Sequence, residues 1–181
     1  MNIQEQYQKI ISELELGSRA LMRYSSEEKE ELAQEFNREL KSENTDRLEQ
    51  ILCLVDHCAT DDSRFEPMIL STLEASLPPR LLIFTLNCAR KHIIQARFKR
   101  GHRLEFDFLD ALQKLLFSTS PEVVEWTLRS IEECGNQGVF FLQYFDKIKP
   151  PPWKWLNPHS RAVREIITML ERRWSRFEKQ T

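Results

Sequence analysis

Apolar residues recur at steps of three and four along most of the chain, which is the spacing of one face of an α-helix. The pattern is clear at the start, in Ile3, Tyr7 and Ile10, and near the end, in Val163 and Ile166. Tight β-hairpins depend on glycine at positive φ, and the 181 residues include only 4 glycines. The sequence therefore predicts an all-α fold.

Capping residues, glycines and prolines divide the pattern into successive helices. Ser25 and Glu28 have the spacing of a capping box, and Ser120 before Pro121 is suited to begin a helix. Gly17 is expected to interrupt the first helical segment, Ile3 to Tyr24. The remaining expectations are a helix over 80–95, a connection over 96–104, an extended proline segment at 150–152 and a last helix from Asn157-Pro158.

Four helix starts share one apolar register when they are aligned at Asp46, Pro79, Pro121 and Arg161. Of the 12 residues that lie two, five and nine positions after these anchors, 11 are apolar. Position six holds a branched residue each time, which suits contact with a neighbouring helix: Leu52, Thr85, Thr127 and Ile167. The anchors are 33, 42 and 40 residues apart. A period of roughly 40 residues indicates one helix pair per repeat.

The segment Phe108 to Gly135 resembles a repeat of the HEAT and armadillo families, with an apolar helix, a Ser/Pro turn, and a second helix closed by glycine. This resemblance implies a short α-solenoid of about four HEAT-like helix pairs over 44–178, preceded by acidic N-terminal helices over 1–43. The alternative is an irregular helical bundle. Either architecture is expected to form a single domain over 1–181.

Charge is distributed unevenly along the chain. Residues 1–66 carry 16 acidic and 8 basic side chains, a net charge of −8, whereas residues 67–181 carry 12 and 18, a net charge of +6. Such asymmetry steers charged partners. The strongest local feature is the basic stretch, residues 90–103, which contains six fixed positive charges and no acid: Arg90, Lys91, Arg97, Lys99, Arg100 and Arg103.

A second acid-free stretch, residues 147–164, combines the cations Lys149 and Lys154 with Trp153 and Trp155, whose rings could stack on a partner. Two alternatives need no partner. The basic stretch could be a solvated connection held by glutamates of the acidic N-terminal helices, and the tryptophans could pack a proline-rigidified crossover against the last helices.

Sequence motifs for catalysis are missing: the chain has no P-loop, dinucleotide-binding, nucleophile-elbow or zinc-protease pattern. Its four cysteines form no Cys-x-x-Cys pair and lie in apolar stretches, where they are expected to pack as small hydrophobes. Cys53 and His57 could share a metal, but structural zinc needs four ligands. No catalytic residue, metal site or cofactor is expected.

Three functions fit these features, and the leading hypothesis is a non-catalytic scaffold that binds an acidic protein partner. One group of expected binding residues comprises the basic stretch with Lys149, Lys154, Trp153 and Trp155. A second group is expected on the exposed surface of the second helices: Arg47, Arg80, Asn87, Glu125 and Arg129. The alternative is nucleic-acid binding, as in the HEAT-like DNA alkylation-repair glycosylases, although a pI near 6.1 disfavours it. The third is an enzyme using His57, His92 or His159.

No apolar run approaches the roughly 18 residues that cross a bilayer, and Met1–Gln6 contains neither the basic nor the apolar part of a secretory leader. A cytoplasmic location and no membrane partner are therefore expected. The sequence leaves the oligomeric state open.

Overall fold

The computed structural model describes residues 1–18, 20–42 and 44–178, without the side chains of residues 155 and 176–178. Most of the described residues are helical and none forms a strand, although Met22 and Cys58 form an isolated bridge. The predicted all-α fold is confirmed. No helix in these ranges is long and apolar enough to cross a membrane.

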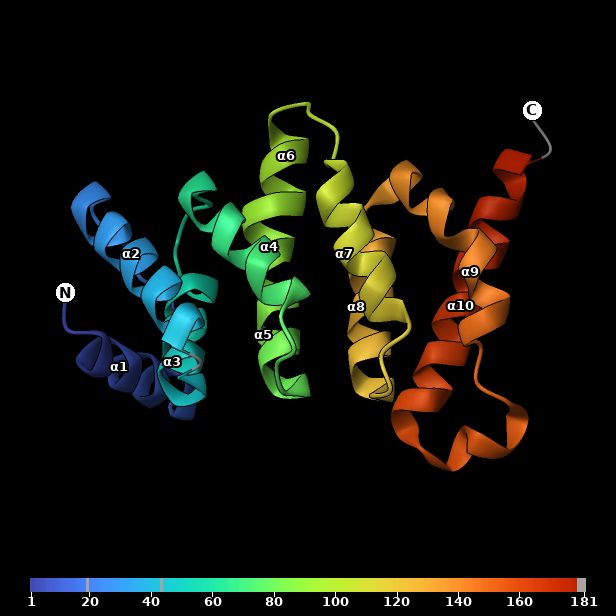
Figure 1. Ribbon diagram of the computed structural model, residues 1–181, viewed down its shortest axis with the longest axis horizontal. Helices are drawn as coiled ribbons and strands as arrows, with labels where there is room; N and C mark the ends of the chain where they lie inside the picture. Colours follow the sequence, from blue (N-terminus) through green and yellow to red (C-terminus); the bar gives the residue numbers. More distant parts are fainter. Residues whose placement is uncertain (19, 43, 179–181) are drawn as a thin grey trace. The chain divides into compact units, whose positions relative to one another are not determined.

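The chain forms two compact units, unit 1 (Met1–Arg103) and unit 2 (Leu104–Thr181). Figure 1 labels the α-helices of each unit. Unit 1 contains α1 (Ile3–Glu15), α2 (Ser26–Ser42), α3 (Thr45–Asp56), η1 (Ser63–Phe65), α4 (Glu66–Glu74), α5 (Pro79–Ala89), η2 (Arg90–Gln95) and α6 (Ala96–Lys99). Unit 2 contains α7 (Phe106–Leu116), α8 (Pro121–Glu133), η3 (Gly135–Phe141), α9 (Leu142–Ile148), η4 (Pro152–Leu156) and α10 (Pro158–Glu178). The expected single domain stays a prediction.

Helices begin where the local sequence predicts. Ser25 and Glu28 form a reciprocal capping box, with the Ser25 N–H donating to the Glu28 carboxylate at 2.9 Å and the Glu28 N–H donating to the Ser25 hydroxyl at 3.2 Å. Ser120 caps α8, and the Asn157 side chain accepts from the Ser160 N–H at 3.0 Å at the start of α10. These contacts satisfy N–H groups that a helix start leaves unpaired.

Glycines at positive φ stand at two helix ends, one where an interruption is expected at Gly17 and one beyond the boundary expected at Gln95. Gly17 (φ 71°) closes α1 at Glu15, so residues 20–25 are not helical. Gly101 (φ 71°) stands after α6, so the helix predicted to end at Gln95 continues to Lys99. At Gly101, the His102 N–H donates to the Arg97 carbonyl at 2.9 Å and the Gly101 N–H to the Phe98 carbonyl at 3.0 Å. This is a Schellman motif, which needs the left-handed conformation that glycine adopts without strain.

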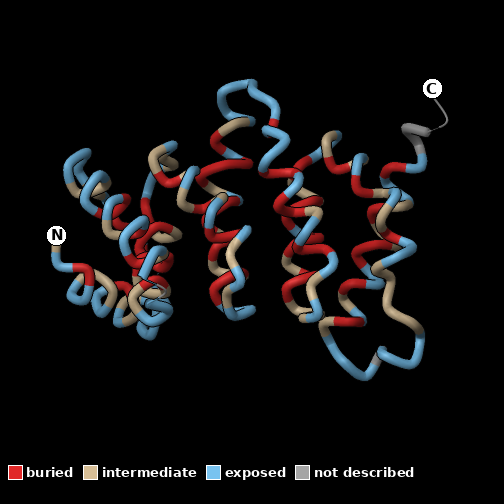
Figure 2. Tube along the Cα trace, in the orientation of Figure 1, coloured by how far each residue is buried: buried red, intermediate tan, exposed pale blue. Residues whose placement is uncertain are grey.

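The core of each unit lies along the helices that carry the shared register, and Figure 2 shows buried residues recurring along them. In unit 1, α3 packs against α1, α2 and α5, and α4 packs on α5. In unit 2, α8 packs against α7 and α10. All four position-six residues are buried: Leu52, Thr85, Thr127 and Ile167. The Thr85 and Thr127 hydroxyls donate to carbonyls four residues earlier, each at 2.7 Å, so their burial leaves no unpaired hydroxyl.

Candidate functional site

The basic stretch begins on one continuous helix made of α5, η2 and α6. Its middle part, η2, is a π-helical turn, in which backbone hydrogen bonds span five residues instead of four. The turn buries three successive side chains, His92, Ile93 and Ile94. Single π turns inside α-helices occur frequently at functional sites, so η2 is the first structural indication of a site here.

A cleft of about 600 Å³ lies beside η2, wholly within unit 1. We call it the basic cleft. Four predicted binding residues line it: Asn87, Arg90, Lys91 and Lys99. The remaining lining residues are Leu14, Ala20, Leu21, Asp56, His57, Ala59, Asp61 and Gln95. The fold therefore places three of the six predicted cations and two carboxylates in the same cleft, beside partly exposed leucines.

Lys91 secures the wall of the cleft. Its ammonium donates to the carbonyl of Asp56 and, at 2.8 Å, to that of Cys58. These carbonyls lie at and just beyond the C-terminal end of α3, where helix carbonyls lack intrahelical partners and cations are favourable. Lys91 thus joins η2 to α3, and its charge is largely committed to the fold.

Lys99 and Arg100 share one carboxylate at the rim of the cleft. Both approach Asp61, at 3.3 and 3.2 Å, and they keep 64% and 44% of their side-chain surface exposed. Burial by itself would raise the pKa of Asp61, but the hydrogen bond and charge of Lys99, with Arg100, outweigh it and lower that pKa. One carboxylate facing two exposed cations leaves the rim with a net positive charge.

Arg97 has a structural role. It forms an ion pair with Glu66 at 2.6 Å, and only 20% and 15% of the two side chains are exposed. Removing one partner of such a pair leaves a poorly solvated charge. Asp61 and Glu66 thus hold Arg97, Lys99 and Arg100 of the basic stretch, whereas the sequence suggested glutamates of the N-terminal helices.

His57 and the cysteines do not form a recognisable reactive group. The Nδ1 of His57 lies 2.9 Å from the Cys53 carbonyl oxygen and 3.8 Å from the Cys53 sulfur. Burial raises the pKa of Cys53 to about 11 and that of Cys58 to about 12, so both are thiols at neutral pH. Among the described residues, no three His, Cys, Asp or Glu side chains are placed to hold a metal.

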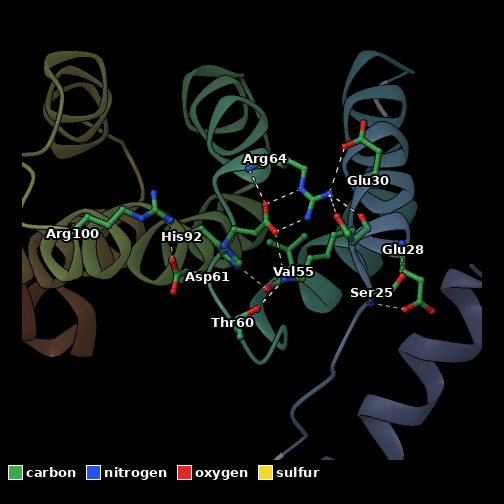
Figure 3. A network of polar contacts seen from close by, with 12 residues as sticks. Ser25, Glu28, Glu30, Val55, Thr60, Asp61, Arg64, His92 and Arg100 are labelled. Carbon is green, nitrogen blue, oxygen red and sulfur yellow. Dashed lines mark hydrogen bonds and ion pairs between the residues drawn. The ribbon is translucent and has the colours of Figure 1, made fainter.

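A buried polar network supports the cleft from behind η2 (Figure 3). The Asp62 N–H donates to Nδ1 of His92 at 2.9 Å, so this nitrogen carries the lone pair. The proton is therefore on Nε2, which lies 2.9 Å from the Val55 carbonyl oxygen and donates to it. With His92 1% exposed, the imidazole connects η2, α3 and the turn before η1 as a neutral side chain.

His92 should make unit 1 less stable in acid. Burial lowers the pKa of His92, so the unfolded chain takes up a proton near pH 6.5 while the folded chain does not. The free energy of unfolding should therefore fall as the pH drops below about 6.5, with a slope of at most about 1.4 kcal/mol per pH unit for this one proton. Urea unfolding at several pH values measures this slope.

His92→Asn supplies the comparison, because its amide oxygen can still accept from Asp62 but it cannot titrate. We expect a shallower loss of stability between pH 7 and pH 5 in this variant than in the wild type, whereas His102→Asn, at an exposed position, should keep the wild-type slope. Identical slopes in all three proteins would contradict the role of His92.

The other predicted residues of unit 1 lie outside the basic cleft. Arg103 is exposed. Arg47 donates to Gln50 at 2.9 Å, and Arg80 pairs with Glu49 at 2.6 Å. Arg47 and Arg80 lie on α3 and α5, and Arg103 lies between α6 and α7, so these three cations do not add to the cleft.

Two of the predicted residues of unit 2, Glu125 and Arg129, lie on α8, and the others lie between α9 and α10. Glu125 was expected to be exposed, but it is 8% exposed, because it accepts from Arg129 at 2.6 Å and lies 2.9 Å from an imidazole nitrogen of His159. This expectation is wrong: the Arg129 guanidinium and the His159 imidazole both contact the carboxylate and allow its burial. Lys149 pairs with Glu171 at 2.9 Å.

The structure around the three prolines contradicts the alternative in which the tryptophans pack this crossover against the last helices. Trp153 is 78% exposed, so it does not pack the crossover against the last helices. Lys154 is exposed on the same turn. The predicted Trp155 contact concerns a side chain outside the described ones.

Sequence reasoning missed the acidic and apolar side of the basic cleft. Asp61 has no local pattern that indicates a site, and Leu14 and Leu21 belong to the first helical segment predicted from the sequence. No local signal could have joined them to Lys99, since their contact depends on tertiary packing. Comparison with protein-family models, curated proteins and solved structures found no match for this chain.

Proposed function

We propose that this protein is a non-catalytic interaction module that binds an acidic segment of a partner protein in the basic cleft. The observation that carries the proposal is the composition of the cleft: Arg90 and Lys99 present positive charge beside Leu14 and Leu21, which are 44% and 46% exposed. A peptide with carboxylates and one apolar side chain matches both features. The apolar contact would contribute affinity and the charges would orient the peptide. Such a segment would therefore bind in one position along the cleft.

The state of the reactive side chains also supports binding over catalysis. The buried Cys53 and Cys58 are thiols and do not line the cleft, and the imidazole of His92 has both nitrogens bonded to the backbone. A general base needs a nitrogen or carboxylate within reach of substrate. His92 offers neither, and Nδ1 of His57, which lines the cleft, lies 2.9 Å from the Cys53 carbonyl oxygen. A binding role needs only the charge and shape of the cleft.

We further propose that the helix pairs are divergent HEAT-like repeats. The buried register supports this: position six is buried in all four helices, and α5 packs on α3 within unit 1 as α10 packs on α8 within unit 2. Repeat proteins bind through extended surfaces formed by stacked helices. On this proposal the basic cleft is part of such a surface.

Charge reversal in the cleft tests the binding function. The probe is a fluorescent, glutamate-rich peptide with a central leucine, followed by fluorescence anisotropy. Arg90→Glu with Lys99→Glu should weaken binding at least about tenfold, because like charges then face the peptide. Arg97 is left unchanged, since its pair with Glu66 supports the fold.

Arg103→Glu is the matched control, because it reverses an exposed cation of unit 1 outside the cleft. It should bind the peptide like the wild type, and thermal unfolding should confirm that all variants stay folded. Wild-type affinity in the Arg90/Lys99 variant would contradict the proposal. So would tighter binding of duplex or single-stranded DNA than of the peptide with a steep salt dependence, which would favour nucleic-acid binding.

A further inference from the structure

A surface turn of unit 2 exposes two large apolar side chains that the fold does not use. Trp153 is 78% exposed and Leu156 is 88% exposed, both within η4. Full exposure of large apolar side chains forgoes the free energy that burial would give. Such side chains at the tip of a turn are typical of a contact surface.

The geometry of the turn places these two side chains together. A 3₁₀ helix has three residues per turn, so residues i and i+3 lie on the same side. Trp153 and Leu156 have this spacing, and the 3₁₀ bonds are formed, with the Lys154 N–H donating to the Pro151 carbonyl at 3.0 Å. The two side chains therefore project as one apolar tip.

The tip is held in place before any partner binds. Pro150, Pro151 and Pro152 restrict φ on the approach. Arg164 of α10 donates to the Pro150 carbonyl at 2.9 Å, and Asn157 caps α10 directly after the turn. A fixed turn loses little conformational entropy on binding.

The charge around the tip is positive. Residues 147–164 contain no acid, and Lys154 is exposed between the two apolar residues. Carboxylates from α8 and α10 face part of this segment: Glu171 pairs with Lys149, Glu165 with Arg161 at 3.8 Å, and Glu125 with His159. Lys154 lies between Lys149 and His159 in the sequence and is exposed, and Lys147 lies over the Tyr144 ring.

We propose that this turn binds an anionic lipid surface, with Trp153 and Leu156 entering the headgroup region and Lys154 contacting lipid phosphates or carboxylates. Tryptophan is favoured at the membrane–water interface, and lysine can keep its ammonium among the headgroups while its stem lies along apolar surface. The exposed residues form a protruding tip, whereas a protein-binding hot spot is usually the centre of a broader patch. Binding at the surface needs no membrane-spanning helix, so it does not depend on the apolar runs that the sequence lacks.

Co-sedimentation of the full chain with vesicles tests the proposal. The vesicles contain phosphatidylcholine with about one third phosphatidylserine, or phosphatidylcholine alone, at about 0.15 M salt. We expect the wild type to bind the anionic vesicles at least about tenfold more tightly than the neutral ones. Trp153→Ala with Leu156→Ala should lose at least about tenfold of this binding, and Lys154→Glu should lose several-fold.

Phe106→Ala is the matched control, because it removes another exposed apolar side chain of unit 2 (82% exposed) outside the turn. It should bind vesicles like the wild type, and circular dichroism should show all variants folded. No binding by the wild type, equal binding to neutral vesicles, or wild-type binding by the Trp153/Leu156 variant would each overturn the proposal. If the wild type does not bind vesicles but needs Trp153 and Leu156 to bind a protein, the turn is a protein-docking site instead.

Discussion

Asp62→Ala should lower the free energy of unfolding by about 3 kcal/mol, because Asp62 is the centre of the polar network behind the basic cleft. Its carboxylate accepts from the Arg64 side chain at 2.9 and 2.8 Å and lies 3.4 Å from the ammonium of Lys29. Lys29 and Asp62 are 14% and 13% exposed. Breaking a buried ion pair costs about 3–5 kcal/mol, and the lower end applies because Arg64 is 31% exposed.

Asp62→Ala also removes a cap, since the same carboxylate accepts from the Arg64 N–H at the start of η1. Equilibrium urea unfolding, followed by circular dichroism, measures the change. Glu30→Ala is the control, because Glu30 contacts the same Arg64 at 3.8 Å but is 53% exposed, so its loss should cost less than about 1 kcal/mol. Equal effects of the two variants would contradict the network.

Gly138→Ala should be comparably destabilising, by about 3 kcal/mol, because the added methyl group has no space. A Cβ atom at this position would lie 2.6 Å from the Trp174 ring and 2.7 Å from the Ile131 carbonyl oxygen. Trp174 is 2% exposed and stacks with Phe145, so it cannot move outward. Overpacking a core in this way costs about 1–3 kcal/mol, and contact with backbone argues for the upper end.

Trp174→Phe provides an internal test of this reason. The smaller ring relieves part of the clash, so the Gly138→Ala/Trp174→Phe double variant should be more stable than the sum of the single changes implies, by about 1 kcal/mol. Asn136→Ala, at an exposed neighbouring position, should leave stability nearly unchanged. Strict additivity of the two core changes, measured by urea unfolding, would rule out the proposed contact.

The features of the fold that depend on residues close together in the sequence could be predicted. Helix starts at Ser25 and Ser120 follow from side chains that bond to N–H groups a few residues away. Helix ends were less accurate, because the continuation to Lys99 depends on the Schellman motif at Gly101 and on a π turn that shifts the apolar register. Periodicity alone does not reveal such a shift.

The candidate site could be predicted only in part, for the same reason. The basic stretch is visible as charge, but its local sequence does not show that Arg97 would pair with Glu66 and Lys99 with Asp61, more than 30 residues earlier. Burial of Glu125 was missed because it depends on His159, 34 residues later. Tertiary partners thus decide which cations support the fold and which line the cleft.

Binding of the acidic peptide in the basic cleft is tested most directly by following the amide resonances of the protein while the peptide is added. The proposed function predicts that the largest shift changes occur at residues lining the cleft, above all Asn87, Arg90, Gln95 and Lys99. The Arg90→Glu/Lys99→Glu variant should lose these changes. Shift changes confined to residues 147–164, or none at peptide concentrations that saturate the anisotropy signal, would contradict it.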